Sequence, residues 1–96
     1  MILVRQYSLQ IASASTDAFF AALGDLVTAL KGVEGFAGAE LLRDNEDPDG
    51  YVFTERWISL DAYKDGAQQL PGTIFKSLME TLKAPPKAAF LTPVVF

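Results

Sequence analysis

Along this 96-residue chain, stretches typical of strands and stretches typical of helices follow one another in a fixed order, and that order restricts the possible folds most. The four strand-like stretches are rich in β-branched and long apolar residues. They cover residues 2–11, 36–43, 51–58 and 88–96. The second and third are joined by an acidic turn that ends in Pro-Asp-Gly, which predicts an antiparallel hairpin.

Two helical regions separate these strands. In the first, over about residues 17–31, apolar side chains recur at helical spacing after a Ser-Thr-Asp sequence that can cap a helix. Ser59 can cap the first part of the second region, and Thr73 can cap its last part. Pro71 interrupts this region and Pro85 ends it, because proline cannot continue a helix.

The resulting order, β-α-β-β-α-β, is the split pattern of ferredoxin-like α+β folds. We therefore predict a single domain over residues 1–96, with a four-stranded antiparallel sheet and both helical regions on one face. Adjacent apolar pairs, Leu41-Leu42 and Val52-Phe53 among them, place apolar side chains on both faces of that sheet. Because one face would otherwise be left in water, we expect a second copy of the chain to cover it.

The composition excludes several kinds of chemistry. The chain has no cysteine and no histidine, so disulfides, thiolate nucleophiles, serine–histidine triads and imidazole ligands for zinc, copper or haem are ruled out. We therefore expect no bound metal and no cofactor. The formal net charge is −4 and the eight basic residues are scattered, which predicts no binding to nucleic acid or to anionic membranes. The apolar run at the N-terminus is too short for the hydrophobic region of a signal peptide, so we expect a cytoplasmic protein.

The acidic turn has part of the pattern of a calcium-binding loop. Asn45, Asp47, Asp49 and Gly50 match the opening of an EF-hand loop, but Arg56 occupies the position that requires a bidentate glutamate. The flanking segments are strands rather than helices, so we interpret the turn as a solvated hairpin. No glycine-rich phosphate-binding sequence is present.

Three short motifs resemble those of the antibiotic biosynthesis monooxygenase family, in that family's order and spacing. They are Gly-Phe-Ala-Gly at 35–38, Glu-Arg-Trp-Ile-Ser at 55–59 and Asp-Ala-Tyr at 61–63. Residues 82–86 and 91–95 resemble its closing segment, so the similarity extends over nearly the whole chain.

The resemblance implies a dimeric α/β barrel, in which the sheets of two copies face each other and each copy keeps a pocket between sheet and helices. It also implies oxygenation of aromatic polyketides or quinols by O2 without a prosthetic group. A related branch degrades haem with an asparagine, a tryptophan and a histidine. Trp57 stands at the tryptophan position, whereas Tyr7 and Met79 fall near the other two. Since Met79 supplies no imidazole, this difference argues against haem degradation.

Seven residues are candidates for a site in such a pocket. We expect three to be catalytic: Trp57 would stack on an aromatic ring, Tyr7 would hydrogen-bond to a substrate carbonyl, and Glu55 would remove a proton. The candidates for substrate binding are Arg5, Tyr63, Phe75 and Met79. Arg5 would stabilise negative charge on the substrate or on oxygen. The structural alternatives are simple packing for the aromatic residues and an ion pair between Glu55 and Arg5.

We therefore predict an enzyme, a cofactor-independent monooxygenase that acts with O2 on a small aromatic substrate such as a phenol, a hydroquinone or a polyketide-like compound. The alternative is a non-catalytic dimeric module of the same fold that binds a small hydrophobic ligand or serves as a structural partner. An open cleft beside Trp57 with two or more convergent polar groups favours the enzyme, and a cleft filled by Phe19, Phe20 and Phe75 favours the module. A third hypothesis, haem binding without histidine, predicts a Soret shift on haem titration.

Overall fold

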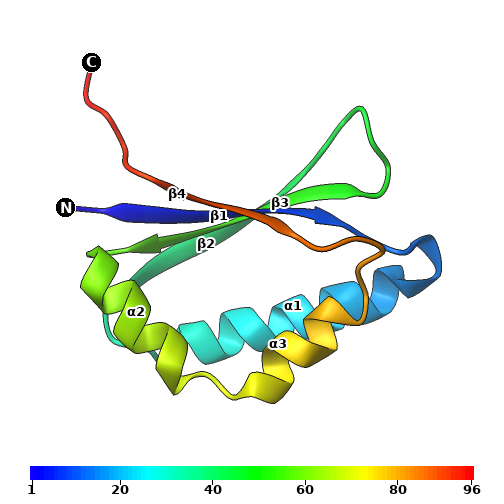
Figure 1. Cartoon of the computed structure of the whole chain (residues 1–96), viewed down its shortest axis with the longest axis horizontal. Helices are drawn as coiled ribbons and strands as arrows, with labels where there is room; N and C mark the ends of the chain where they lie inside the picture. Colours follow the sequence, from blue (N-terminus) through cyan, green and yellow to red (C-terminus); the bar gives the residue numbers. More distant parts are fainter.

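The computed structural model, which describes residues 1–96, contains one four-stranded sheet and three α-helices (Figure 1). In chain order the elements are β1 (Leu3–Gln10), a 3₁₀ turn (Ser13–Ser15), α1 (Thr16–Leu30), β2 (Phe36–Arg43), β3 (Gly50–Trp57), α2 (Leu60–Gln69), α3 (Gly72–Met79) and β4 (Lys87–Leu91). All neighbouring strands are antiparallel, in the order β2-β3-β1-β4. The predicted ferredoxin-like architecture is confirmed, with the second helical region split into two helices.

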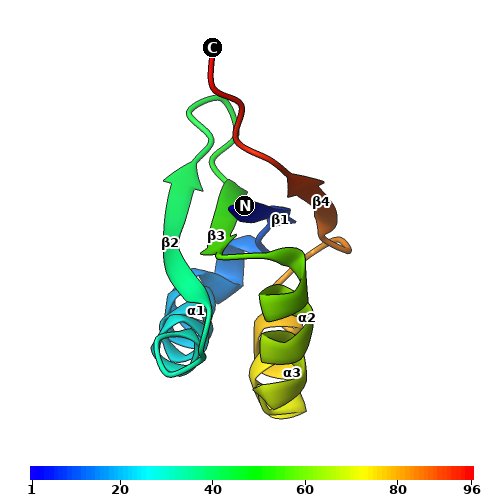
Figure 2. The same ribbon diagram turned by 90° about the vertical axis from the view of Figure 1, so that its left-hand side faces the viewer.

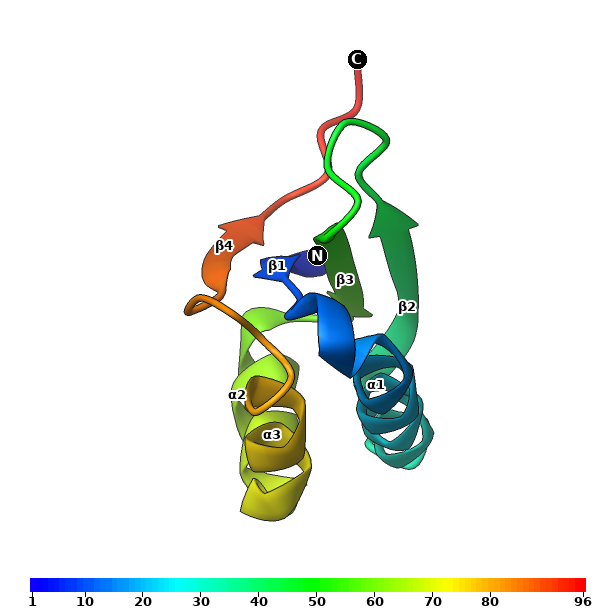
Figure 3. The same cartoon turned by 90° about the vertical axis from the view of Figure 1, so that its right-hand side faces the viewer.

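All three helices lie on one face of the sheet. Figure 2 shows α1 below β2, and α2 and α3 below β4 at the opposite edge. Figure 3 gives the same arrangement from the other side and shows that no helix lies on the other face, beyond which the β2–β3 loop and the C-terminal segment extend. No helix combines the length and the hydrophobicity that a membrane span requires.

The core lies between the sheet and the helices. Alternate residues of β1 and β3 point into it, and α1 contributes one apolar stripe because its buried residues recur every three or four positions. The buried residues of α1 are Phe19, Ala22, Leu23, Leu26 and Leu30. Leu78 is the buried residue of α3.

The uncovered face of the sheet, which we call the open face, carries the other alternate residues of the same strands. Val52 lies there, whereas its neighbour Phe53 is buried under the helices. Leu42 is 45% exposed on the open face, and Leu91 of β4 is also exposed. The prediction that apolar side chains lie on both faces is therefore confirmed.

The two predicted caps of the second helical region differ in outcome. The Ser59 hydroxyl accepts a hydrogen bond from the backbone N–H of Ala62 at 3.0 Å, as a capping serine does. The prediction for Thr73 is wrong, because α3 begins at Gly72 and its N-cap position is held by Pro71. Pro71 has an extended backbone and is the last residue between α2 and α3, so α3 starts directly after it.

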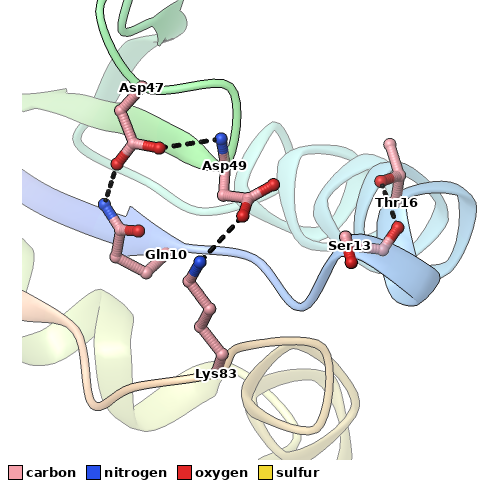
Figure 4. Close-up of polar contacts among 6 residues, drawn as sticks. All are labelled: Gln10, Ser13, Thr16, Asp47, Asp49 and Lys83. Carbon is pink, nitrogen blue, oxygen red and sulfur yellow. Dashed lines mark hydrogen bonds and ion pairs between the residues drawn. The ribbon is translucent and has the colours of Figure 1, made fainter.

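The cap expected at the start of α1 is also absent. Ser15 occupies the N-cap position, but its side chain makes no capping hydrogen bond. The hydroxyl of Thr16 instead donates to the carbonyl oxygen of Ser13 at 3.1 Å (Figure 4). In the 3₁₀ turn that precedes α1, the backbone N–H of Ser15 donates to the carbonyl oxygen of Ala12. Backbone hydrogen bonds thus lead into the helix, which reduces the need for a side-chain cap.

The last strand is shorter than predicted, since β4 ends at Leu91 rather than at residue 96. Leu91 pairs with Val4, near the beginning of β1, so few residues of β1 remain beyond this point. Pro93 follows two residues later and has no N–H to donate to a ladder. β4 therefore ends beside the beginning of β1, beyond which no strand is left to pair with.

The acidic turn between β2 and β3 closes the predicted hairpin through its own side chains. Asp44 and Asp47 accept hydrogen bonds from the backbone N–H groups two residues ahead. Asp47 also accepts a 2.7 Å hydrogen bond from Gln10, and Asp49 pairs with Lys83 at 2.7 Å (Figure 4). The turn thus links the end of β1 to the segment that follows α3.

Candidate functional site

The two central strands bring four predicted site residues to the same side of the sheet. In the antiparallel register of β1 and β3, Arg5 lies opposite Glu55. Tyr7 lies two residues further along β1, and Trp57 two residues further along β3. Because side chains alternate along a strand, all four point toward the helices. The prediction that Glu55 and Trp57 share a face is confirmed.

A pocket of about 50 Å³ lies between these strands and the helices. Its wall is formed by Tyr7, Leu9, Leu26, Phe53, Glu55, Phe75, Leu78 and Met79. Four of the seven predicted site residues are among them, and only Tyr7 and Glu55 bring a hydroxyl or a carboxylate. The pocket is therefore apolar with two polar groups, which is the usual composition of a small-molecule site.

Phenylalanine side chains do not fill this pocket. Phe75 forms part of its wall, but Phe19 and Phe20 pack against Tyr51 elsewhere, outside that wall. The space is nevertheless small, since an engineered apolar cavity that binds benzene measures about 150 Å³. A ligand with one aromatic ring would therefore have to widen the pocket on entering.

Glu55 is a buried acid without a basic partner. Its side chain is 4% exposed, and one carboxylate oxygen accepts a hydrogen bond from the Trp57 indole N–H at 3.0 Å. The ion pair of this chain is Lys83–Asp49, and no such pair joins Glu55 to Arg5. Burial raises the pKa of Glu55, and the Trp57 hydrogen bond and the Arg5 charge offset only part of that rise.

Trp57 lies behind Glu55 and outside the pocket wall. It is 1% exposed and packs edge-on against Phe36 and Tyr63, with ring centroids 5.5 and 5.7 Å apart. Gly66 of α2 lies directly against the indole, so that a Cβ at this position would be 2.7 Å from two ring carbons. The contact visible in the structure is the hydrogen bond to Glu55, and no open surface of the ring faces the pocket.

Tyr7 connects the pocket to Arg5. Its hydroxyl oxygen accepts a hydrogen bond from Arg5 Nε at 3.2 Å, and its ring stacks on Phe53 at a centroid distance of 6.4 Å. Burial, the neighbouring Tyr63 and the Glu55 charge raise the pKa of Tyr7, so the phenol stays protonated at neutral pH. Tyr7 is therefore a hydrogen-bond donor and cannot serve as the base that accepts a substrate proton.

Arg5 and Tyr63 lie beside the pocket rather than in its wall. The guanidinium carbon of Arg5 is 4.0 Å from the ring centroid of Phe90, 4.9 Å from that of Tyr7 and 5.6 Å from that of Tyr63. Sequence reasoning missed Phe90, which faces Arg5 only because β4 pairs with β1. It also missed Gly66. A glycine within a helix does not by itself indicate close packing, since Gly24 of α1 has nothing within 4 Å of its Cβ position.

The pocket offers no set of metal ligands. Glu55 is the one acidic residue in its wall, and nowhere do three or more His, Cys, Asp or Glu side chains cluster closely enough to hold a metal ion. The chemistry that these residues can support is proton transfer and hydrogen bonding in an apolar environment.

The sequence profile that describes antibiotic biosynthesis monooxygenases matches residues 1–83. The chain belongs to the antibiotic biosynthesis monooxygenase family. The resemblance carried by the three sequence motifs is thereby confirmed for the family. No significant match to a curated protein sequence was found.

Several solved structures share the fold over almost the full length. SnoaB, a cofactor-independent oxygenase from Streptomyces nogalater, is 18% identical, with a TM-score of 0.85 over 99% of this chain and 95% of its own. A putative antibiotic biosynthesis monooxygenase from Bordetella bronchiseptica is 19% identical, with a TM-score of 0.85 over 98% of both chains. Another from Caulobacter crescentus is 19% identical, with a TM-score of 0.86 over 98% of this chain and 91% of its own. At these identities the likeness establishes the fold alone.

Proposed function

We propose that this member of the family is a cofactor-independent monooxygenase that acts with O2 on a small, electron-rich aromatic substrate. The observation that supports this most is Glu55, a buried carboxylate without a basic partner in the wall of an apolar pocket. SnoaB, which shares the fold, is described as a cofactor-independent oxygenase and supports the same class of reaction.

Glu55 is the group that removes the proton from the substrate. The Trp57 N–H occupies one of its oxygens, and no bond is recorded for the other. Because burial raises its pKa, Glu55 is a stronger base than an exposed glutamate once it is ionised. Trp57 is then a positioning residue, which fixes the carboxylate while remaining outside the pocket.

Tyr7 supports this step from the neighbouring strand. As a protonated phenol, it donates a hydrogen bond to the substrate oxygen on which negative charge develops. Phe75 and Met79 contact the aromatic ring from α3, since both form part of the pocket wall. Met79 is 41% exposed, which puts it where the pocket meets solvent.

The reaction balances without a cofactor for a substrate that has an acidic CH2 group next to an electron-rich aromatic ring. Glu55 takes one proton, and the resulting anion passes one electron to O2, which gives a substrate radical and superoxide. These combine through a new C–O bond, and the peroxide regains the proton from Glu55. Loss of water then converts the CH–OOH group to C=O, so that the CH2 group and O2 become a carbonyl and water.

Oxygen uptake with a panel of hydroquinones and anthrone-like phenols tests this proposal. Removing a general base typically lowers the rate about 10²-fold or more, so we expect that loss in Glu55→Gln and a smaller one in Tyr7→Phe. Glu46→Gln, in the exposed turn, is the matched control and should keep the wild-type rate. Wild-type uptake equal to the buffer blank, or an unchanged rate in Glu55→Gln, would contradict the proposal. Binding without uptake would favour the non-catalytic module.

We also propose that the protein is a homodimer in which the open faces of two sheets pack together. Leu42 and Leu91 support this arrangement, because both are exposed apolar side chains on the otherwise uncovered face. Leu42→Arg should shift sedimentation equilibrium from dimer to monomer. Leu60→Arg, on α2, is the matched control, since Leu60 is 42% exposed but lies away from this face. A wild-type monomer at micromolar concentration would refute the dimer.

A further inference from the structure

Arg5 differs from every other basic side chain of the protein. The other seven Lys and Arg side chains are exposed, whereas Arg5 is half-buried between the sheet and α2. Three aromatic rings, from Tyr7, Tyr63 and Phe90, lie within 6 Å of its guanidinium carbon. Cation–π contacts of this kind hold the guanidinium in one place and remove part of its water shell.

The guanidinium is nevertheless poorly satisfied by protein groups. It has five N–H donors; Nε–H donates to the Tyr7 hydroxyl, and the Tyr63 hydroxyl also interacts with the guanidinium. No carboxylate lies within ion-pair distance, although Glu55 is its cross-strand neighbour. Glu55 is held by Trp57 instead. A guanidinium packed among aromatic rings, with N–H groups left over for a ligand, is suited to a planar anion.

The position of this cation relative to the pocket decides which anion fits. Tyr7 forms part of the pocket wall and also contacts Arg5, so the guanidinium is one side chain away from the space where an aromatic ring would lie. A carboxylate carried by such a ring would meet the guanidinium beside the Tyr7 hydroxyl, to which Arg5 already donates. A neutral phenol or hydroquinone offers these donors only uncharged hydroxyl oxygens, which accept weaker hydrogen bonds than a carboxylate does.

We propose that Arg5 binds the carboxylate of an aromatic acid, and that the substrates of this protein are hydroxyaromatic carboxylates. The inference rests on the proposed function for the reaction at the ring. The competing explanation is a purely structural one, in which Arg5 only joins β1, β4 and α2 through its three aromatic contacts. The two explanations differ in ligand preference, which can be measured without turnover.

A matched pair of ligands provides the test: 2,5-dihydroxybenzoate and hydroquinone, which differ only in the carboxylate. Titration calorimetry on the wild-type protein should show at least about tenfold tighter binding of the acid, because a charge-assisted hydrogen bond is worth that much. Arg5→Met, which keeps most of the packing, should abolish this preference, mainly by weakening the binding of the acid. Arg5→Lys, which keeps the charge and loses the fork, should retain part of it.

Arg43→Met is the control for the change in net charge. Arg43 also lies over an aromatic ring, 5.5 Å from the centroid of Tyr51, but it is exposed and outside the pocket wall. The preference for the acid should survive in this variant. Should Arg5→Met fail to fold, as judged by circular dichroism, the comparison of Arg5→Lys with the wild type decides.

Three results would overturn the proposal: equal affinity of the wild-type protein for both ligands, no saturable binding of the acid, or an undiminished preference in Arg5→Met and Arg5→Lys. These outcomes are separate from those of the proposed function. Oxygen uptake without a preference for the acid refutes the role of Arg5 alone. A preference for the acid without oxygen uptake refutes the oxygenase and leaves the anion site in place.

Discussion

The two ends of the layer between sheet and helices are packed very differently. At the α2 end, Gly66 lies directly against Trp57 with no room for a further carbon atom. At the α3 end, Leu78 is buried, but Phe75 and Met79 leave an open space above Tyr7. One end is as dense as a protein interior, whereas the other contains a pocket that solvent can reach.

Glu55 lies where these two regions meet. Its carboxylate is fixed from the dense side by the indole of Trp57 and borders the pocket on the other side. A catalytic group has to be held in one orientation while the ligand next to it exchanges. The dense packing at α2 therefore holds the carboxylate in place, and the open packing at α3 leaves room for the ligand to exchange.

Trp57→Ala should have the largest effect, because it empties the dense end. Truncating a buried tryptophan typically costs about 3–5 kcal/mol of unfolding free energy, measured by urea denaturation with circular dichroism.

Trp57→Phe separates packing from positioning. It keeps most of the ring volume but loses the N–H, so the pKa of Glu55 should rise further and the acid limb of kcat/KM should move to higher pH. An unshifted limb would contradict the positioning role.

Gly66→Ala should destabilise the dense end by about 1–3 kcal/mol, the usual cost of overpacking. The new Cβ would lie 2.7 Å from the Trp57 ring and 2.8 Å from Val33. Gly24→Ala in α1 is the matched control, because nothing lies within 4 Å of its Cβ position. Alanine favours a helix over glycine by about 1 kcal/mol, so this variant should be more stable than the wild type. The same sign for both variants would contradict the packing difference.

The junction between the two ends can be tested through pH. Since the folded-state pKa of Glu55 is raised above its ordinary value of 4.5, the native state binds its proton more tightly than the unfolded state. This contribution to stability is fully present below pH 4.5 and is lost as pH rises through the folded-state pKa. Glu55→Gln should therefore gain stability relative to the wild type between pH 4 and 7. A constant difference over this range would mean that Glu55 has an ordinary pKa.

Met79→Ala should have the smallest effect on stability, less than about 1 kcal/mol, because much of the side chain is already in water. Its effect on binding should be larger in proportion, since the variant widens the pocket at its opening. Compared with the wild type, the variant should bind two-ring ligands more tightly, and this gain should be larger than any gain for one-ring ligands. Calorimetry measures both dissociation constants. A large loss of stability would show that the α3 end is also densely packed.

Most of the fold could be predicted from the sequence, because strand and helix periods and turn residues are local signals. The errors fall where local signals compete with long-range ones. Thr73 has good capping chemistry, but Pro71 fixes where the backbone leaves the extended conformation. Val94 and Val95 have strand propensity, but the partner strand β1 has already ended beside them.

The site was less predictable for the same reason. The alternation along β3 correctly placed Glu55 and Trp57 on one face, but it carried no information on which of them borders a cavity. That depends on α2, whose Gly66 lets the helix close over Trp57. The environment of Arg5 depends on Phe90, more than eighty positions away in the chain, so no local pattern could reveal it.

The central position of β1 has a consequence for how the protein folds. Tyr7 pairs with Phe53 on one side and with Ala88 on the other, so neither neighbour of the first strand is close to it in sequence. Contacts of such long sequence separation slow folding, because large loops must close before the contacts form. During synthesis β1 and α1 emerge long before β4, and the sheet can be completed only after Leu91 has left the ribosome.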